Sequence, residues 1–148
     1  MLDVVFSAAS IEWTAPAQWT PVNQIEMRTE NMSVVNGSTQ VALIWSYTLP
    51  PGSNTRSTRF HTNKDTSDVI GSIFHDTSEY EIRDVNDYQT RFNISRNAQA
   101  TLIINQVTQR EEGVYQCELE TRPLATWRYN IRVIVTGKNC YVHISLYT

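Results

Sequence analysis

Hydrophobic and polar positions alternate along short runs of this chain, and the spacing of an amphipathic helix is rare. The runs are rich in residues that favour β-structure and are separated by residues that favour turns. They predict strands at residues 25–35, 40–49, 58–63, 67–74, 79–85, 89–95, 100–105, 113–121 and 127–136. About nine short strands at this spacing predict an all-β domain built as a two-sheet sandwich.

The same alternation predicts which side chains face the core. Successive side chains of a strand point to opposite faces, so Tyr115, Cys117 and Leu119 share the inner face of the strand at 113–121. The opposite face of this strand carries Gln116, Glu118 and Glu120. By the same reasoning Asn93 points outward, because its two apolar neighbours occupy inner positions.

Composition and charge narrow the possible partners. Of the 148 residues, 41% are hydrophobic and 18% are charged, which is typical of a globular domain large enough for its own core. The net charge is -3 and the basic residues form no cluster, so nucleic acid is not an expected partner. No apolar run approaches the roughly 20 residues that cross a bilayer. Any membrane attachment is therefore expected only through segments missing downstream of this chain.

The sequence offers no arrangement typical of catalysis or of metal binding. His61, His75 and His143 are widely separated, and there is no C-x-x-C or H-E-x-x-H motif. A glycine-rich phosphate loop and a nucleophile elbow are also missing. We therefore expect no enzyme activity, no cofactor, no metal and no small-molecule substrate.

Three motifs in the second half of the chain stand at a familiar spacing. They are RFNIS from Arg91, ATLIINQV from Ala100 and EEGVYQC ending at Cys117. In these motifs, and over roughly residues 25–136, the chain resembles an immunoglobulin V-set domain, whose strands D, E and F they match. The resemblance implies a Greek-key sandwich of two sheets.

The resemblance also implies roles for three residues of these motifs. Tyr115 matches the tyrosine corner of strand F, in which a hydroxyl ties down the preceding turn. Arg91 and Glu111 match the partners of a salt bridge at the lower end of the sandwich. The family usually has Asp at the position of Glu111, and the extra methylene of glutamate is compatible with that pair.

One departure from the V-set pattern concerns the usual disulfide between strands B and F. The stretch NGSTQVALIWSY matches strand B and places Trp45 where the first cysteine belongs. Phe60 stands about where strand C has its buried tryptophan. The resemblance thus implies that Cys117 has no cysteine partner on strand B and that aromatic packing replaces the disulfide. The alternative is a different register of strand B, with Trp45 as an ordinary core residue nearby.

Cys140, the second cysteine, lies beyond the last predicted strand. A bond to Cys117 requires the tail to turn back until the two Cα atoms are within about 7 Å. Otherwise Cys117 is a small buried hydrophobic residue, and Cys140 is free or pairs with a following domain.

Residues 137–148 are interpreted as an extra strand or the start of a linker. Residues 1–24 are an N-terminal extension whose tryptophans either cover a sheet edge or continue strand A.

Three N-x-S/T sequons predict N-linked glycans at Asn31, Asn36 and Asn93. Asn93 points outward from strand D, and the other two flank the region of strands A and B. All three are therefore expected on the sheet formed by strands A, B, E and D. The outer face of the other sheet, formed by strands G, F, C and C′ and called the GFCC′ face, is predicted to be free of sugar.

The GFCC′ face is predicted to carry mixed charge. A hairpin that turns around Leu124 pairs Glu120 with Arg128, Glu118 with Asn130 and Gln116 with Arg132. One interpretation is a solvated face with weak cross-strand pairs, each worth roughly 0.2–1 kcal/mol. The resemblance favours another, because V-set domains commonly bind one another through this face. Alternating charges on such a face can be self-complementary across a two-fold axis.

Loss of the strand B cysteine and of the strand C tryptophan resembles the unusual domains of cnidarian (hydroid) allorecognition receptors. This implies an extracellular cell-surface domain, a fragment of the ectodomain of a single-pass membrane protein. The implied partner in trans is protein, with another copy of the chain on an opposing cell as the expected one.

The alternatives are a heterophilic immune-type receptor, a structural spacer and a carbohydrate-binding V domain. For a carbohydrate-binding V domain, Trp127 offers an aromatic platform, but Glu118 and Glu120 repel an acidic sugar.

Overall fold

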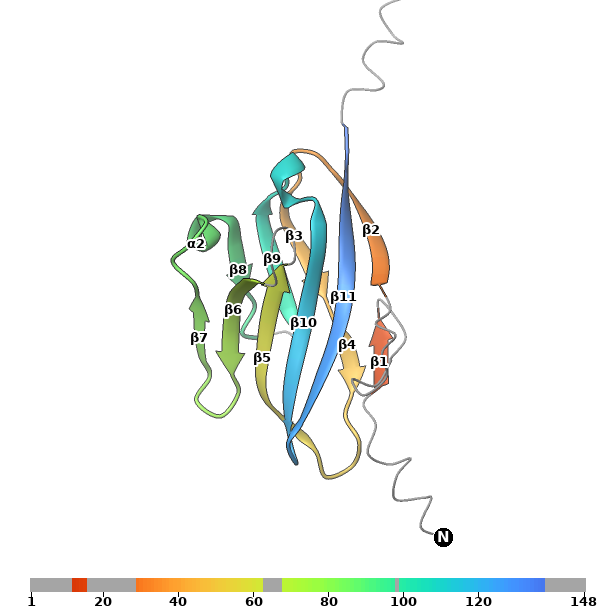
Figure 1. Cartoon of the computed structure of the whole chain (residues 1–148), viewed down its shortest axis with the longest axis vertical. Coiled ribbons are helices and arrows are strands. Elements are labelled where there is room, and N and C mark those ends of the chain that lie inside the picture. The colour runs from red at the N-terminus through yellow and green to blue at the C-terminus, as the bar shows by residue number, and fades with distance from the viewer. Residues whose placement is uncertain (1–11, 16–28, 63–67, 98, 138–148) are drawn as a thin grey trace, which may run out of the picture.

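Strands dominate the described part of the chain. The computed structural model describes residues 12–15, 29–62, 68–97 and 99–137 (Figure 1). The strands are β1 (Glu12–Ala15), β2 (Thr29–Val35), β3 (Thr39–Ile44), β4 (Ser46–Thr48), β5 (Asn54–Thr62), β6 (Asp68–Phe74), β7 (Glu79–Ile82), β8 (Phe92–Ile94), β9 (Thr101–Gln106), β10 (Gly113–Arg122) and β11 (Ala125–Thr136). Two short helical turns, α2 (Tyr88–Arg91) and η1 (Gln109–Glu111), connect strands within these ranges. No helix in the described ranges has the length and apolar character needed to span a membrane.

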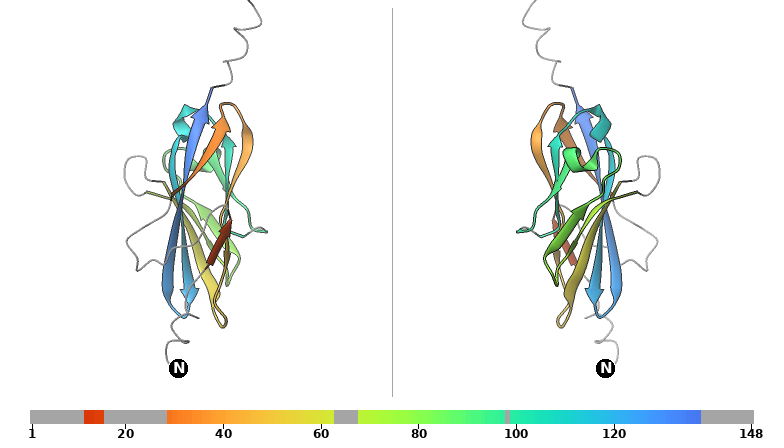
Figure 2. Two further views of the ribbon diagram at one scale, coloured as in Figure 1. Left: turned by 90° about the vertical axis from the view of Figure 1, so that its right-hand side faces the viewer. Right: turned by 90° about the vertical axis from the view of Figure 1, so that its left-hand side faces the viewer.

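Most of the strands form two sheets packed face to face. The larger sheet has six strands in the order β2-β11-β10-β5-β6-β7, and the smaller has three in the order β3-β9-β8. Figure 2 shows the two layers from the side. β1 pairs with β4, which follows β3 beyond Trp45. Neighbouring strands are antiparallel, except that β2 runs parallel to β11. The described chain is therefore the all-β two-sheet sandwich that the alternation predicts.

The core lies between the sheets and is built from alternate residues of the facing strands. Tyr115, Cys117 and Leu119 on β10 are all buried, so the predicted inner face of this strand is correct. Trp45 and Phe60 are among the largest fully buried side chains. Because aromatic side chains bury the most apolar area, these two contribute much of the stability of the core.

Several predicted strands have different bounds in the structure: the strand predicted at 79–85 ends at Ile82, and larger differences affect those predicted at 40–49 and 58–63. The predicted strand at 40–49 is split at Trp45, whose backbone N–H donates to Ala100 O at 3.0 Å. β3 then pairs with β9, whereas β4 pairs with β1. The predicted strand at 58–63 begins earlier, because the Ser53 N–H donates to Pro50 O at 3.1 Å and completes the preceding turn. β5 therefore starts directly after this turn.

The predicted strand at 89–95 is wrong in its first half, where the chain forms the helical turn α2. Asp87 has a left-handed φ of 60°, and its carbonyl accepts from the Arg91 N–H at 3.0 Å. Tyr88 is buried, and its hydroxyl donates to Asp68 Oδ2 at 2.9 Å. This tertiary contact holds the turn against the strand pattern, and only the second half forms β8.

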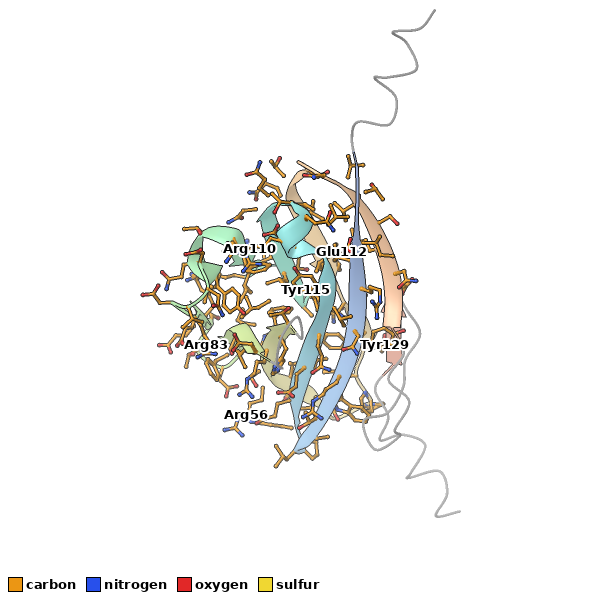
Figure 3. The ribbon with its side chains drawn as sticks, turned by 45° about the horizontal axis from the view of Figure 1, so that its top comes forward. Arg56, Arg83, Arg110, Glu112, Tyr115 and Tyr129 are labelled. Atoms are coloured by element: carbon orange, nitrogen blue, oxygen red, sulfur yellow. The ribbon has the colours of Figure 1, made fainter. Side chains whose placement is uncertain are left out.

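A buried carboxylate fixes the turn between β9 and β10. Glu111 Oε2 accepts from the backbone N–H and the hydroxyl of Thr108, at 2.9 and 2.6 Å. Glu111 Oε1 accepts from Arg91 Nε at 3.2 Å. The Tyr115 hydroxyl donates to Glu111 O at 2.6 Å, which is a tyrosine corner, and Figure 3 labels Tyr115 near η1. We call these four residues the Glu111 lock.

Opposing effects act on the Glu111 carboxyl. Burial raises its pKa, but the hydrogen bonds from Thr108 and the guanidinium of Arg91 outweigh burial and hold the pKa below its usual value. The carboxylate is therefore the stable form inside the lock, because its donors favour the charged state.

Trp45 links the two sheets at a point where no disulfide is present. Its indole Nε1 donates to Tyr129 O on β11 at 3.1 Å, and its ring centroid lies 5.6 Å from that of Phe60. Phe60 lies opposite Cys117 in the pairing of β5 with β10. Cys117 is free and fully buried, and burial raises the pKa of its thiol well above the usual value. Cys140 lies outside the described residues.

Candidate protein-binding face

The outer face of the six-stranded sheet is organised around β10, between β5 and β11. Three cross-strand rows run over these strands. The rows are Arg128, Glu118 and Arg59; Asn130, Gln116 and His61; and Thr126, Glu120 and Ser57. We call these rows, together with Arg56 beside Ser57, the β5–β10–β11 face.

The pairing of β10 with β11 corrects the predicted hairpin. Thr121 pairs with Ala125, so the turn centres on Pro123 and not on Leu124. The Thr121 hydroxyl donates to Pro123 O at 3.1 Å and closes this turn, whereas Leu124 is exposed. Glu118 therefore lies opposite Arg128, Gln116 opposite Asn130, Glu120 opposite Thr126, and Arg132 opposite Val114. The six predicted residues share the outer face, but the three predicted pairs are wrong.

Glu118 is the centre of the charge network on this face. Its Oε2 accepts from Arg128 Nε at 2.7 Å, and its Oε1 accepts from Arg59 Nη1 at 3.2 Å. His61 Nε2 lies 3.7 Å from the same Oε1. The neighbouring His61 and Arg128 lower the pKa of Glu118 from 4.5 to about 2, although partial burial opposes the shift. Because only 13% of its side chain is exposed, Glu118 acts as an internal anchor for the surrounding cations.

Two ion pairs with exposed members lie at one end of the face. Arg56 Nη1 lies 2.9 Å from Glu120 Oε1, with side chains 51% and 31% exposed. Arg122 and Asp76 form a second exposed pair at 2.5 Å. Phe74, which is 45% exposed, stands on the same cross-strand row as Glu120. Figure 3 shows Arg56 projecting from the side of the sandwich at this end. Exposed aromatic and arginine side chains are enriched in contacts between proteins.

Sequence reasoning missed the contribution of β5 to this face. The signal was available, because Arg59 and His61 flank Phe60 in the run RSTRFH and must point away from the core when Phe60 points into it. Arg56 enters the face through an irregularity in the pairing, which shifts register after Glu120. Such an irregularity leaves no clear sequence signal.

The geometry of the face suits binding by complementary charge. Glu118 and Glu120 are both paired with arginines, so neither carboxylate is left free to act as a general base. Among the residues that the structure describes, no three His, Cys, Asp or Glu side chains are grouped to hold a metal ion. The face offers paired charges next to the exposed ring of Phe74 on β6, a combination suited to a complementary surface.

Comparison with solved structures identifies the architecture. The chain is 17% identical to the first Ig-like domain of human CD48, with a TM-score of 0.61 over 80% of this chain and 91% of that one. It is 14% identical to murine CRIg, with a TM-score of 0.63 over 86% of this chain and 98% of that one. The chain has the fold of an immunoglobulin V-type domain.

A further V-type structure is that of the extracellular domain of the voltage-gated sodium channel beta4 subunit. It is 17% identical, with a TM-score of 0.55 over 78% of this chain and 98% of that one. No family model matches the chain. No curated protein matches it either. The comparisons therefore show the V-type fold.

The V-type fold assigns strand letters to the sheets. The order β11-β10-β5-β6 corresponds to strands G, F, C and C′, and β3, β9 and β8 correspond to B, E and D. The tyrosine corner on β10 is where strand F of such a domain carries it. The β5–β10–β11 face therefore belongs to the GFCC′ face.

The three sequon asparagines are exposed, but they do not all lie on the smaller sheet. Asn93 is on β8, as predicted, and Asn36 follows β2 in a turn. Asn31 lies on β2 and pairs with Arg132 of β11, so it shares the outer face of the six-stranded sheet. The prediction for Asn31 is wrong because β2 pairs with β11 and not with β3. The GFCC′ face thus has a sequon at its β2 edge, beside Arg132.

Proposed function

We propose that this chain is an extracellular recognition domain of a cell-surface protein, and that it binds another protein through its GFCC′ face. The observation that carries the proposal is the end of this face where Phe74 and Arg56 are exposed beside the half-buried Glu120. An aromatic side chain beside complementary charge supplies both affinity and specificity. The fold supports the proposal, because the extracellular domains of the beta4 subunit form parallel homodimers that explain its role in cell–cell adhesion.

We further propose that the partner is a second copy of the chain on an opposing cell, in self-recognition of the allorecognition type. A two-fold axis brings the same patch of both copies together. Arg56 and Glu120 are neighbours of opposite charge, so rotation about that axis allows each to face its opposite in the other copy. Arg122 and Asp76 repeat this arrangement at the rim.

Two kinds of residue contribute differently to the proposed contact. Glu118 is mostly covered, and it holds the guanidinium groups of Arg59 and Arg128 over the sheet. Arg56 and Glu120 reach solvent and are the residues that meet the partner. A glycan at Asn31 limits the contact at the opposite edge of the sheet, so we place the contact toward Phe74 and not toward Arg132.

The test uses the chain displayed on beads or cells, with clustering of like with like as the readout. Glu120→Arg puts two positive charges at the proposed contact, and Arg56→Glu puts two negative charges there. We expect each variant to lose self-clustering, because like charges meet across the two-fold axis. Mixed populations of the two variants are expected to cluster with each other, because opposite charges then meet.

The matched control is Asp84→Arg, which reverses an exposed acid between β7 and α2, outside the proposed contact. It is expected to cluster as the unchanged chain does. Clustering of the unchanged chain that both face variants retain contradicts the proposed site but keeps the function. Absence of clustering of the unchanged chain at every density contradicts homophilic binding and favours a heterophilic receptor or a spacer.

A further inference from the structure

A groove opens between the edges of the two sheets, where β7 of the larger sheet faces β8 of the smaller one. Figure 1 shows these two strands as neighbours, with α2 across one end. The groove has a volume of about 530 Å³, and its lining includes Tyr80, Gln89, Asn93 and Asn105. Both β7 and β8 are edge strands, whose unpaired backbone groups are open to pairing with other chains unless something covers them.

The lining of this groove has the mixed character that a sugar matches. Gln89 Nε2 donates to Ile82 O at 3.1 Å, and Asn105 Nδ2 donates to Thr90 O at 2.8 Å. These bonds fix two amide side chains, and the Gln89 oxygen is available as an acceptor, whereas Asn105 Oδ1 already accepts from Gln40 Nε2 at 3.4 Å. Tyr80 adds an aromatic ring that is partly exposed. N-acetylglucosamine offers hydroxyl and amide donors on its edges and C–H groups on its faces, which suit such a lining.

Tyr80 is held in place on the far wall of the groove. The Arg96 guanidinium lies over its ring, with Cζ 4.1 Å from the ring centroid. This cation–π contact covers one face of the ring and fixes its orientation. The groove is therefore preformed on both walls, because the amides are bonded to the backbone and the ring is held by Arg96.

Asn93 stands at the lip of the groove within the sequon Asn93-Ile94-Ser95. Its side chain is exposed, and its Oδ1 accepts from the Ile94 N–H at 2.9 Å. That bond orients the amide. Nδ2, the atom that receives an N-linked glycan, has no hydrogen-bond partner among the described residues. Asn93 Nδ2, the atom that accepts the glycan, therefore lies next to a preformed groove that suits a sugar.

We propose that Asn93 carries an N-linked glycan and that its first N-acetylglucosamine residues lie in this groove. A bond forms between Asn93 Nδ2 and C1 of the first sugar, while the C1–O bond to a lipid diphosphate donor breaks. The amide proton leaves, and the lipid diphosphate is the leaving group. The packed sugar covers the edges of β7 and β8, and it adds bulk and solubility at the place where strand pairing between chains is otherwise possible.

The inference rests on the proposed extracellular location, because the glycan is added in the secretory pathway. It does not rest on the binding face, which is centred on β10. The chain is secreted from a eukaryotic host, and peptide mapping by mass spectrometry measures occupancy at Asn93 and at Asn36. Hydrogen exchange of the glycoprotein is then compared with that of the Asn93→Gln variant and of the matched Asn36→Gln variant, whose asparagine lies in an exposed turn.

We expect occupancy at Asn93 and faster amide exchange in β7 and β8 in Asn93→Gln, by about fivefold, which corresponds to ~1 kcal/mol. Asn36→Gln is expected to leave exchange in these strands unchanged. An unoccupied Asn93 in a chain glycosylated at Asn36 overturns the inference and leaves the extracellular location standing. Occupancy at Asn93 with unchanged exchange in Asn93→Gln overturns the packing of sugar in the groove. A secreted chain without any glycan also overturns the inference.

Discussion

Two glutamates of this domain bind arginine in different surroundings. Glu111 is tied to Thr108, three residues earlier in the chain, and to Arg91, whose side chain is 15% exposed and lies over the ring of Phe92. Glu118 is tied to arginines on two neighbouring strands, with side chains 42% and 39% exposed. Both carboxyls have a pKa below the usual value. The same ion-pair chemistry therefore closes the fold at one site and arranges a surface at the other.

The largest expected effect comes from breaking the Glu111 lock. We expect Glu111→Gln to lower the free energy of unfolding by about 3 kcal/mol, because Arg91 loses its buried partner and the donors of Thr108 lose their charged acceptor. Urea unfolding measures the loss, with Glu79→Gln as the control for an exposed acid on β7. A loss no larger than that of the control contradicts the role of the lock.

A smaller effect is expected from the tyrosine corner within the same lock. Tyr115→Phe keeps the ring, whose centroid lies 5.9 Å from that of Phe92, and removes the hydroxyl that donates to Glu111 O. We expect it to lower the free energy of unfolding by about 1.5 kcal/mol, because a buried acceptor is left without its donor. Thermal unfolding measures the midpoint of Tyr115→Phe, and Tyr80→Phe, whose ring is at the surface, is the control. Equal midpoints for the two variants contradict the prediction.

The smallest loss of stability is expected at the other glutamate. Glu118→Gln should lower the free energy of unfolding by only about 1 kcal/mol at neutral pH, because solvent screens its exposed arginine partners. The pKa of Glu118 is lowered from 4.5 to about 2, so the contribution of this carboxyl is present above pH 4.5 and is lost as the pH falls to about 2. Over that range the unchanged chain should lose more stability than Glu118→Gln, as urea unfolding at a series of pH values will measure.

The two glutamates are further separated by clustering. Glu118→Gln releases Arg59 and Arg128 from their anchor, so we expect weaker clustering from a folded chain. Glu111→Gln, at a temperature where it stays folded, is expected to cluster normally. If Glu111→Gln and Glu118→Gln lose stability and clustering to the same extent, the two glutamates do not have the separate roles proposed for them.

The sequence predicts the layers of this molecule better than it predicts their pairing. Alternation depends only on the two-residue period of a strand, so the inner position of Tyr115 and the outer position of Glu118 follow directly. Register depends on the turn, and the Thr121 hydroxyl bond to Pro123 O moves the hairpin by one residue from its predicted centre. Every predicted partner on β11 is displaced, although no side chain changes face.

Long-range choices account for the other differences. β2 pairs with β11, more than a hundred positions later, and nothing in the run around Asn31 signals that choice. The turn α2 depends on the bond from Tyr88 to Asp68, which belongs to another strand. The outward residues of β5 were predictable once Phe60 was placed in the core. The outward residues of β5 follow from local alternation alone. The pairing of β2 and the turn α2 depend on contacts that form only in the completed fold.

The bond from the Trp45 indole to Tyr129 O links the two sheets without a disulfide. We therefore expect this link not to depend on redox conditions. Most extracellular domains of this size that rely on a disulfide need an oxidising compartment to form it and lose stability when it is reduced. Here the buried thiol of Cys117 is already free, and the join consists of a hydrogen bond and packed aromatic rings. Thiol reductants therefore have no bond to cut between the sheets in the described part of the chain, and we expect the sandwich to unfold at the same temperature with and without them.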